Sequence, residues 1–225
     1  MAAACALVMQ SGCTSLPTPA IVALVGVPDP AKLSVIVEKH PSASGSIERS
    51  MFFIAEMHTK EQLFANALKP LAFAPAAALT EAIAEAFLLP GRSVIRATNP
   101  QRDREDFLRD YAVLGISAGL YIDIVPLSIG YWAESPAGAY RPWVMVDYRL
   151  YDSLNAKAVA SGQIGTGPIA PGDSVTSIAP DNQFAFPSFE ALTNDPARAV
   201  AGLRAAIRQV AQALARKVQV VAVRK

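Results

Sequence analysis

The clearest strand pattern in this chain is Val144-Met145-Val146-Asp147-Tyr148-Arg149-Leu150, and the rest of the predicted fold is built around it. Its apolar residues alternate with Met145, Asp147 and Arg149. A period of two predicts a β-strand with one face on a core and the other toward water. An amphipathic strand of this kind needs neighbouring strands to complete a sheet.

Strands are predicted on both sides of this stretch. Residues 120–129 are strongly β-branched and lead into Tyr131-Trp132, and the connection to the central strand contains Pro136 and Gly138. These features predict an antiparallel hairpin. A turn over 152–157 then leads to a third strand over 158–165. Three consecutive antiparallel strands form a meander.

A long amphipathic helix is predicted at the C-terminus. Asp195-Pro196 places a capping carboxylate directly before a proline at the first helical position. The apolar residues that follow recur at three- and four-residue steps, and the arginines lie off that stripe: Val200, Leu203, Ile207, Val210, Leu214 and Val218 against Arg204, Arg208 and Arg216. We expect this helix to cover a sheet rather than to bind a membrane or a partner.

The remaining segments predict short alternating elements. The predicted strands are 21–27, 33–38, 50–57 and 93–97, and the predicted helices are 60–68, 75–88 and 102–113. A segment over 165–192 is rich in glycine and proline, shows no periodicity, and predicts a long loop of the functional or mobile kind. The expected fold is α+β, with an antiparallel or mixed sheet covered by helices.

Composition favours one domain without cofactor chemistry. The 225 residues suffice for a single core, expected over 20–225, with residues 1–19 as a tail and linker. Lys and Arg number 20 against 19 Asp and Glu, a balance that gives no basic footprint for nucleic acid. Cys5 and Cys13 are the only cysteines, so the body offers no disulfide framework or cysteine-based metal site. We expect no cofactor and no metal.

The N-terminal residues Ser11-Gly12-Cys13-Thr14 follow a short apolar run over 2–9. This pattern resembles the lipobox of bacterial lipoproteins, although Gln10 stands where that family prefers Leu and no basic residue precedes Lys32. The resemblance implies a signal peptide that is cut before Cys13 and acyl chains attached at Cys13. A true start upstream of Met1 would explain the missing basic region. The alternative is a tail of small residues with an incidental cysteine.

The same resemblance implies a location. A Thr directly after the cysteine, rather than an Asp, fits sorting to the outer membrane in that family. The protein would then be lipid-anchored on the periplasmic side of the outer membrane, whereas the alternative is a cytoplasmic structural domain. No segment has the roughly 20 apolar residues that a membrane-spanning helix needs.

Aromatic residues provide the candidate interaction surface. One group surrounds the end of the predicted hairpin and the other lies in the long loop; the candidates are Trp132, Tyr140, Arg141, Trp143, Phe184, Phe186 and Phe189. Trp, Tyr and Arg are common anchors of interfaces. The alternatives are a packed cluster that fixes strand register, and phenylalanines that fold back onto the domain.

Gly115-Ile116-Ser117-Ala118-Gly119 matches the G-x-S-x-G pattern of serine hydrolases. That pattern needs a strand before the serine and a helix after it, and the predicted order here is the reverse. Both histidines, His40 and His58, precede Ser117, whereas that fold places its histidine later. We expect turn glycines and no catalysis; a periplasmic serine hydrolase using Ser117 is the alternative.

The order of predicted elements between residues 93 and 165 resembles a wider group of proteins. The order is a helix over 103–113, Leu114-Gly115, a strand over 120–129, a strand start at Tyr140-Arg141-Pro142-Trp143 and a strand end near Tyr151-Asp152. This order is similar to that in the auxiliary lipoproteins of ABC-type lipid transporters and in curli-secretion lipoproteins. The resemblance implies a non-catalytic accessory protein of an envelope transport or assembly complex that binds a partner protein or a lipid.

Overall fold

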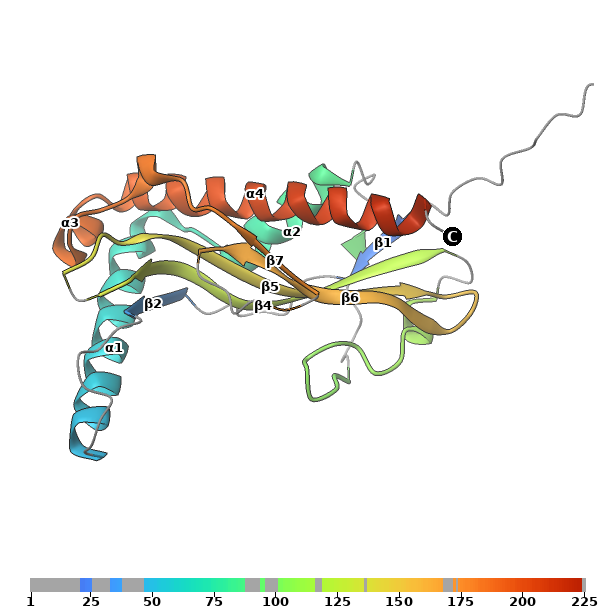
Figure 1. The fold of residues 1–225 in the computed structure, drawn as a ribbon, viewed down its shortest axis with the longest axis horizontal. Coiled ribbons are helices and arrows are strands. Elements are labelled where there is room, and N and C mark those ends of the chain that lie inside the picture. The colour runs from blue at the N-terminus through green and yellow to red at the C-terminus, as the bar shows by residue number, and fades with distance from the viewer. Residues whose placement is uncertain are drawn as a thin grey trace, which may run out of the picture.

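A computed structural model describes residues 21–25, 33–37, 47–87, 94–95, 101–115, 119–135, 137–167, 172 and 174–223. Its centre is a seven-stranded sheet, ordered β3-β1-β4-β5-β6-β7, with β2 also paired to β4 (Figure 1). The strands are β1 (Ile21–Val25), β2 (Leu33–Val37), β3 (Val94–Ile95), β4 (Leu120–Ala133), β5 (Arg141–Asp152), β6 (Lys157–Thr166) and β7 (Val175–Ile178).

The meander β4-β5-β6 is antiparallel throughout, as the alternating pattern predicts. The opposite edge of β4 pairs in parallel with two short strands, β1 near Leu120 and β2 near Ile129. Parallel pairing of β6 with β7 completes a mixed sheet. The predicted α+β fold is therefore confirmed, with the sheet of the mixed kind.

A β-bulge divides β4 into two halves. The register shifts between Pro126 and Ser128, so Leu127 has no partner on β5, and its side chain is 43% exposed. The core-facing residues consequently change from even numbers, such as Ile122, to odd numbers, such as Tyr131. Proline suits such a position because it has no N–H to donate to the ladder.

Helices α1 (Ile47–Leu68), α2 (Pro75–Ala86), α3 (Phe189–Asn194) and α4 (Pro196–Val223) complete the domain. Helix α4 runs along one face of the sheet, which we call the inner face, and α2 lies beside it (Figure 1). The predicted stripe of α4 lies in the core except for the half-buried Val200, and its three predicted arginines are exposed. The Asp195 carboxylate accepts the Arg198 N–H, as the capping prediction requires.

Gly202 permits the close approach of α4 to the sheet. A Cβ at this position would collide with the Tyr131 hydroxyl and lie 2.8 Å from Cβ of Phe184. The Tyr131 hydroxyl uses this space to donate to the Ala199 carbonyl at 3.1 Å. A small residue in the second turn of α4 therefore fixes how the helix lies on β4.

The predicted strand over 50–57 is wrong, because these residues belong to α1. The run Met51-Phe52-Phe53-Ile54 fits a buried strand or a buried helix equally well by periodicity, and only its continuation through Leu68 identifies the helix. The predicted helix over 60–68 is correct as the second half of α1. A 3₁₀ turn at Lys69–Leu71, which contains Pro70, follows it.

The predicted helix over 102–113 is also wrong. Residues Gln101–Arg109 form a small hairpin, with a bridge between Arg102 and Leu108, and a 3₁₀ turn follows at Ala112–Leu114. The Asp103 carboxylate accepts the N–H groups of Glu105 and Phe107, and such local bonds compete with a helix. We call residues 101–115 the clasp.

The segment over 165–192 contains more regular structure than the sequence predicts. It includes β7, a 3₁₀ turn at Asn182–Phe184 and the start of α3. Strand β7 is only four residues long, and its partner β6 lies before it in the chain. Glycines and prolines on both sides conceal so short an element from any periodicity test.

Candidate functional site: the outer face of the sheet

The face of the sheet opposite α4, which we call the outer face, carries the polar and aromatic side chains that the core does not use. On β5 these are the residues that alternate with the core positions: Arg141, Trp143, Met145, Asp147, Arg149 and Tyr151. Their partners on β4 run from Trp132 opposite Arg141 to Tyr121 opposite Tyr151. The outer face therefore has a tryptophan end and a polar end.

Asp123 is the centre of the polar end. It lies on β4 opposite Arg149, is fully buried, and is covered by the clasp. Its Oδ2 accepts the Leu108 N–H at 2.8 Å and the Tyr111 hydroxyl at 2.9 Å. Its Oδ1 accepts no hydrogen bond among the described residues and lies 3.9 Å from Nη1 of Arg102. One carboxylate thus fastens the clasp to the sheet.

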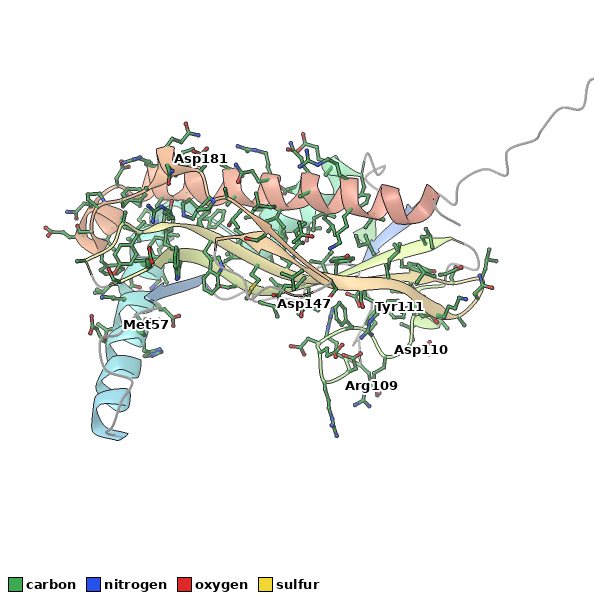
Figure 2. All side chains as sticks on the ribbon, viewed as in Figure 1. Met57, Arg109, Asp110, Tyr111, Asp147 and Asp181 are labelled. Atoms are coloured by element: carbon green, nitrogen blue, oxygen red, sulfur yellow. The ribbon has the colours of Figure 1, made fainter. Side chains whose placement is uncertain are left out.

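Arg149 fastens the clasp from the other strand. Its guanidinium donates to the carboxylates of Asp103 at 2.8 Å and Glu105 at 3.1 Å, and lies 4.1 Å from the centre of the Phe107 ring. The Tyr111 ring stacks on Tyr151 at 4.1 Å. Figure 2 shows Tyr111 close against the sheet and Arg109 pointing away from it.

Burial controls the protonation of this cluster. It raises the pKa of Asp123 above its usual value, and the hydrogen bonds from Leu108 and Tyr111 only partly oppose that rise. Burial, followed by the proximity of Asp123, raises the pKa of Tyr111, so its hydroxyl remains a donor. Burial acts to raise the pKa of Asp103 as well, but bonds from Arg149 and the backbone lower it below its usual value.

Burial also limits the chemistry that this cluster can perform. Because Asp123 is fully enclosed beneath the clasp, no substrate reaches it in this conformation. The arrangement suits attachment of the clasp rather than general acid–base catalysis. The sequence offers one signal for it, an Asp within a β-branched strand, because a buried carboxylate needs partners.

Trp132 and Trp143 define the tryptophan end. They are diagonal neighbours across β4 and β5, with Gly130 opposite Trp143. Both indole N–H groups are buried, and neither meets an acceptor among the described residues. Leu127 lies exposed at the bulge of β4, five residues before Trp132. A buried indole donor without an acceptor costs free energy.

A close backbone approach shapes the tryptophan end. Gly167 has a φ of 90°, and a Cβ there would lie 3.2 Å from Cδ1 of Trp143. The neighbouring Thr166 is fully buried; its hydroxyl accepts the Val144 N–H and donates to the Pro142 carbonyl. The Trp143 indole therefore lies over the start of the chain segment that leaves β6.

The structure separates the four other predicted aromatic residues from this face and leaves Arg141 on it. Tyr140 and Phe186 form an isolated backbone bridge, and each is only 1% exposed in the core, so for these two the packing alternative is confirmed. Phe189 is half-buried with its ring centre 5.9 Å from that of Tyr140. Phe184 is half-buried against α4, and Arg141 donates to Asn182 at 3.1 Å.

Cys13, Ser117 and His40 lie outside the described residues. Gly115 and Gly119, which flank the serine, both have positive φ values, 71° and 140°, as expected of turn glycines. Strand β4 follows Gly119 as predicted, whereas the element before Gly115 is a 3₁₀ turn and not the expected helix.

Other candidate sites carry little chemistry. Within the described ranges, no group of three or more His, Cys, Asp or Glu side chains is placed to hold a metal ion. A cavity of about 80 Å³ lies between α2 and α4, lined by Ala78, Glu81, Ala82, Glu85, Arg204, Ile207 and Arg208. In the described part of the chain, no helix alone has the length and hydropathy of a membrane span; Glu56–Leu71 and Pro75–Ala86 qualify only as a pair bent by 66°.

No family model matches the chain, and no curated protein matches it. Among solved structures, protein XCC0632 from Xanthomonas campestris, which carries the family description DUF330, is 13% identical, with a TM-score of 0.42 over 92% of this chain and 89% of that one. A Caulobacter crescentus CB15 protein provisionally described as a lipoprotein is 14% identical, with a TM-score of 0.29 over 66% of this chain and 81% of that one. At these scores neither likeness assigns a family or a function.

Proposed function

We propose that this protein is a lipid-anchored, non-catalytic accessory protein of a cell-envelope transport or assembly complex. The observation that carries the proposal is Ser11-Gly12-Cys13-Thr14 behind a short apolar run, eight positions before the first strand begins at Ile21. Acyl chains on Cys13 hold the mature protein at the periplasmic side of the outer membrane. Several acyl chains anchor firmly, whereas a single chain anchors only marginally.

The tryptophan end of the outer face is the contact surface for the partner. It combines two tryptophans, whose indole N–H groups meet no acceptor among the described residues, with the exposed Leu127 on a rigid sheet. Trp side chains are frequent interface anchors because they bury a large area and donate one directed hydrogen bond. The partner would pack against the exposed Leu127 and the half-buried Trp143.

Anchoring is tested by replacing Cys13 with Ser, feeding cells a palmitate analogue and fractionating their membranes. We expect the unaltered protein to incorporate the label and pellet with outer membranes, and the Cys13→Ser protein to do neither. Cys5→Ser is the matched control, because the proposed processing removes that residue. An unlabelled, freely soluble unaltered protein would refute the anchor.

Partner contact is tested by placing a photo-crosslinking amino acid at position 143 and irradiating membranes. We expect a crosslinked product that is absent when the same group replaces Arg208, which is exposed on the opposite, α4 side. A defined adduct at 208 and none at 143 would contradict this surface. A fluorophosphonate probe should leave the protein unlabelled, and labelling at Ser117 would instead establish a serine hydrolase.

A further inference from the structure

One end of the molecule gathers the features that a membrane-facing surface needs. Strand β1 begins at Ile21 opposite Leu120, the first residue of β4, and Leu120 pairs with Asp152, the last residue of β5. The start of β1, the turn between β5 and β6, and the C-terminal end of α4 therefore lie together, at the right of Figure 1. We call this the tether end.

The linker between Cys13 and β1, residues 14–20, keeps this end close to an anchor at Cys13. Ile21 follows Cys13 by eight positions, and a fully extended chain spans at most ~3.6 Å per residue. The acylated cysteine therefore lies within about 29 Å of the start of β1, whatever path the linker takes. The 28 residues of α4 extend for about 42 Å, at 1.5 Å per residue, toward the opposite end. This linker keeps the start of β1 within reach of the lipid, whereas the opposite end lies about 42 Å of helix farther away.

The most exposed large apolar side chains among the described residues are also at the tether end. Leu154 is 71% exposed and Val113 is 61% exposed, whereas Leu63 on α1 is next at 51%. Leu154 lies in the turn between β5 and β6. Val113 lies in the 3₁₀ turn that the stacking of Tyr111 on Tyr151 holds beside that strand end.

The turn presents Leu154 in a defined way. The Asp152 carboxylate accepts the N–H groups of Leu154 and Asn155 and the Asn155 side-chain amide. Ala156 closes the turn with a φ of 49°, and the Ser153 N–H donates to the Gly119 carbonyl at 3.0 Å. A leucine held outward on a turn with this many bonds is a fixed projection rather than a side chain on a loose loop.

We propose that the tether end lies on the lipid surface, with Leu154 and Val113 inserted among the lipids. This inference rests on the proposed anchor at Cys13. Exposed Lys157 and Arg216 lie near this end, but so does exposed Asp110, so the attraction comes from burial of apolar surface and not from charge. A lipid layer fits better than a protein partner because the anchor already holds this end beside it.

In this orientation, the opposite end of the molecule points away from the lipid. Helices α1 and α3 and the turn between β4 and β5 lie there, at the left of Figure 1. Trp132 and Trp143 lie on the half of the sheet near that turn. The proposed contact surface would then project into the periplasm, with α4 as a rigid spacer along the sheet.

The test uses the full-length protein, processed in cells and reconstituted in phosphatidylethanolamine–phosphatidylglycerol vesicles. Leu154→Cys carries an environment-sensitive fluorophore, and Leu63→Cys is the matched control on α1. Processing before Cys13 removes Cys5, so each variant has one free thiol. We expect a doxyl-labelled lipid to quench the fluorophore at 154 at least threefold more strongly than the one at 63.

Two outcomes overturn the inference, and they are distinguishable. Acylated protein that shows equal quenching at both positions, or stronger quenching at 63, removes the orientation and leaves the anchor intact. Protein that the mass spectrum shows to be unacylated removes the anchor and the orientation with it. Val113→Cys is the second labelled position, and its quenching should follow that of 154 if both residues enter the same lipid layer.

Discussion

Asp123 and Gly202 are two residues whose surroundings determine how the sheet is covered. Asp123 is enclosed beneath the clasp, and one of its carboxylate oxygens accepts no hydrogen bond among the described residues. Gly202 lies where α4 crosses Tyr131 and Phe184. The sequence marks Asp123 only as an Asp within a β-branched strand, and it cannot show the partners of either residue, because these contacts join segments distant along the chain.

Replacing Asp123 with Asn should change how stability depends on pH. Burial raises the pKa of Asp123 in the folded state, so the folded state binds this proton more tightly than the unfolded state. The stability that this carboxyl contributes is therefore fully present below its unfolded pKa of about 3.8 and declines as the pH rises. An Asn at this position does not titrate.

Urea unfolding of both proteins between about pH 4 and pH 7 measures this difference. We expect the free energy of unfolding of Asp123→Asn to rise relative to that of the unaltered protein as the pH increases. The comparison cancels Asp103, whose lowered pKa acts in the opposite sense. A relative gain by the unaltered protein on raising the pH would show that folding lowers the pKa of Asp123 instead of raising it.

Gly202→Ala should destabilise the fold although alanine is the better helix former. The new methyl group meets the Tyr131 hydroxyl and Cβ of Phe184, and overpacking of this kind costs about 1–3 kcal/mol. Thermal unfolding measures the effect. The matched control is Ala201→Gly at the exposed neighbouring position, with an expected loss of about 1 kcal/mol from helix propensity alone. A more stable Gly202→Ala protein would refute the close approach.

The clasp is the element whose stability depends most on a few side chains. Arg149→Met should release it without unfolding the sheet, because Met retains the aliphatic stem but loses both carboxylate bonds. The bond to the half-buried Asp103 contributes roughly 1.5–3 kcal/mol, whereas solvent screens the bond to the exposed Glu105, and about 1.4 kcal/mol corresponds to a factor of ten. We therefore expect amide exchange of Phe107 and Leu108 to accelerate at least about tenfold.

Hydrogen exchange followed by NMR tests this prediction residue by residue. The matched control is Arg109→Met, since Arg109 belongs to the same clasp but is exposed and points away from the sheet (Figure 2). Exchange in β4 and β5 should remain slow in both variants. Unchanged exchange at Leu108 in Arg149→Met would show that Asp123 alone holds the clasp.

Elements with a complete periodic signal were predictable, and those with local exceptions were not. The alternation of apolar and polar residues predicts the meander, and an apolar stripe that begins after the capping Asp195 predicts α4. The first half of α1 resembles a strand because consecutive apolar residues carry no period. The clasp resembles a helix because its charges fit i,i+4 spacing, whereas Asp103 and Asp123 take its backbone N–H groups instead.

The candidate site was predictable only in part, because local sequence does not show which way each aromatic side chain faces. Sequence composition selected Trp132 and Trp143, and the structure places both on one face, but it buries Tyr140 and Phe186 in the core. The sequence cannot distinguish an aromatic side chain that packs inward from one that faces a partner, because strand register decides this. Register depends here on the bulge at Leu127.

On the scale of the whole molecule, we propose a spacer whose tether end contacts lipid and whose opposite end contacts a partner. In this proposed arrangement, the short linker between Cys13 and Ile21 would hold the tether end near the membrane, and α4 separates that end from α1 and α3. The arrangement requires acyl chains on Cys13. Without them the tether end has no reason to face lipid rather than water.

The mass of the N-terminal peptide of the mature protein, isolated from its own cell membranes, tests this requirement most directly. We predict a peptide that begins at Cys13 and carries the added mass of its acyl chains, with residues 1–12 absent. A peptide that retains Met1, or one in which Cys13 carries a free thiol, would contradict the anchor and with it the orientation of the molecule on the membrane.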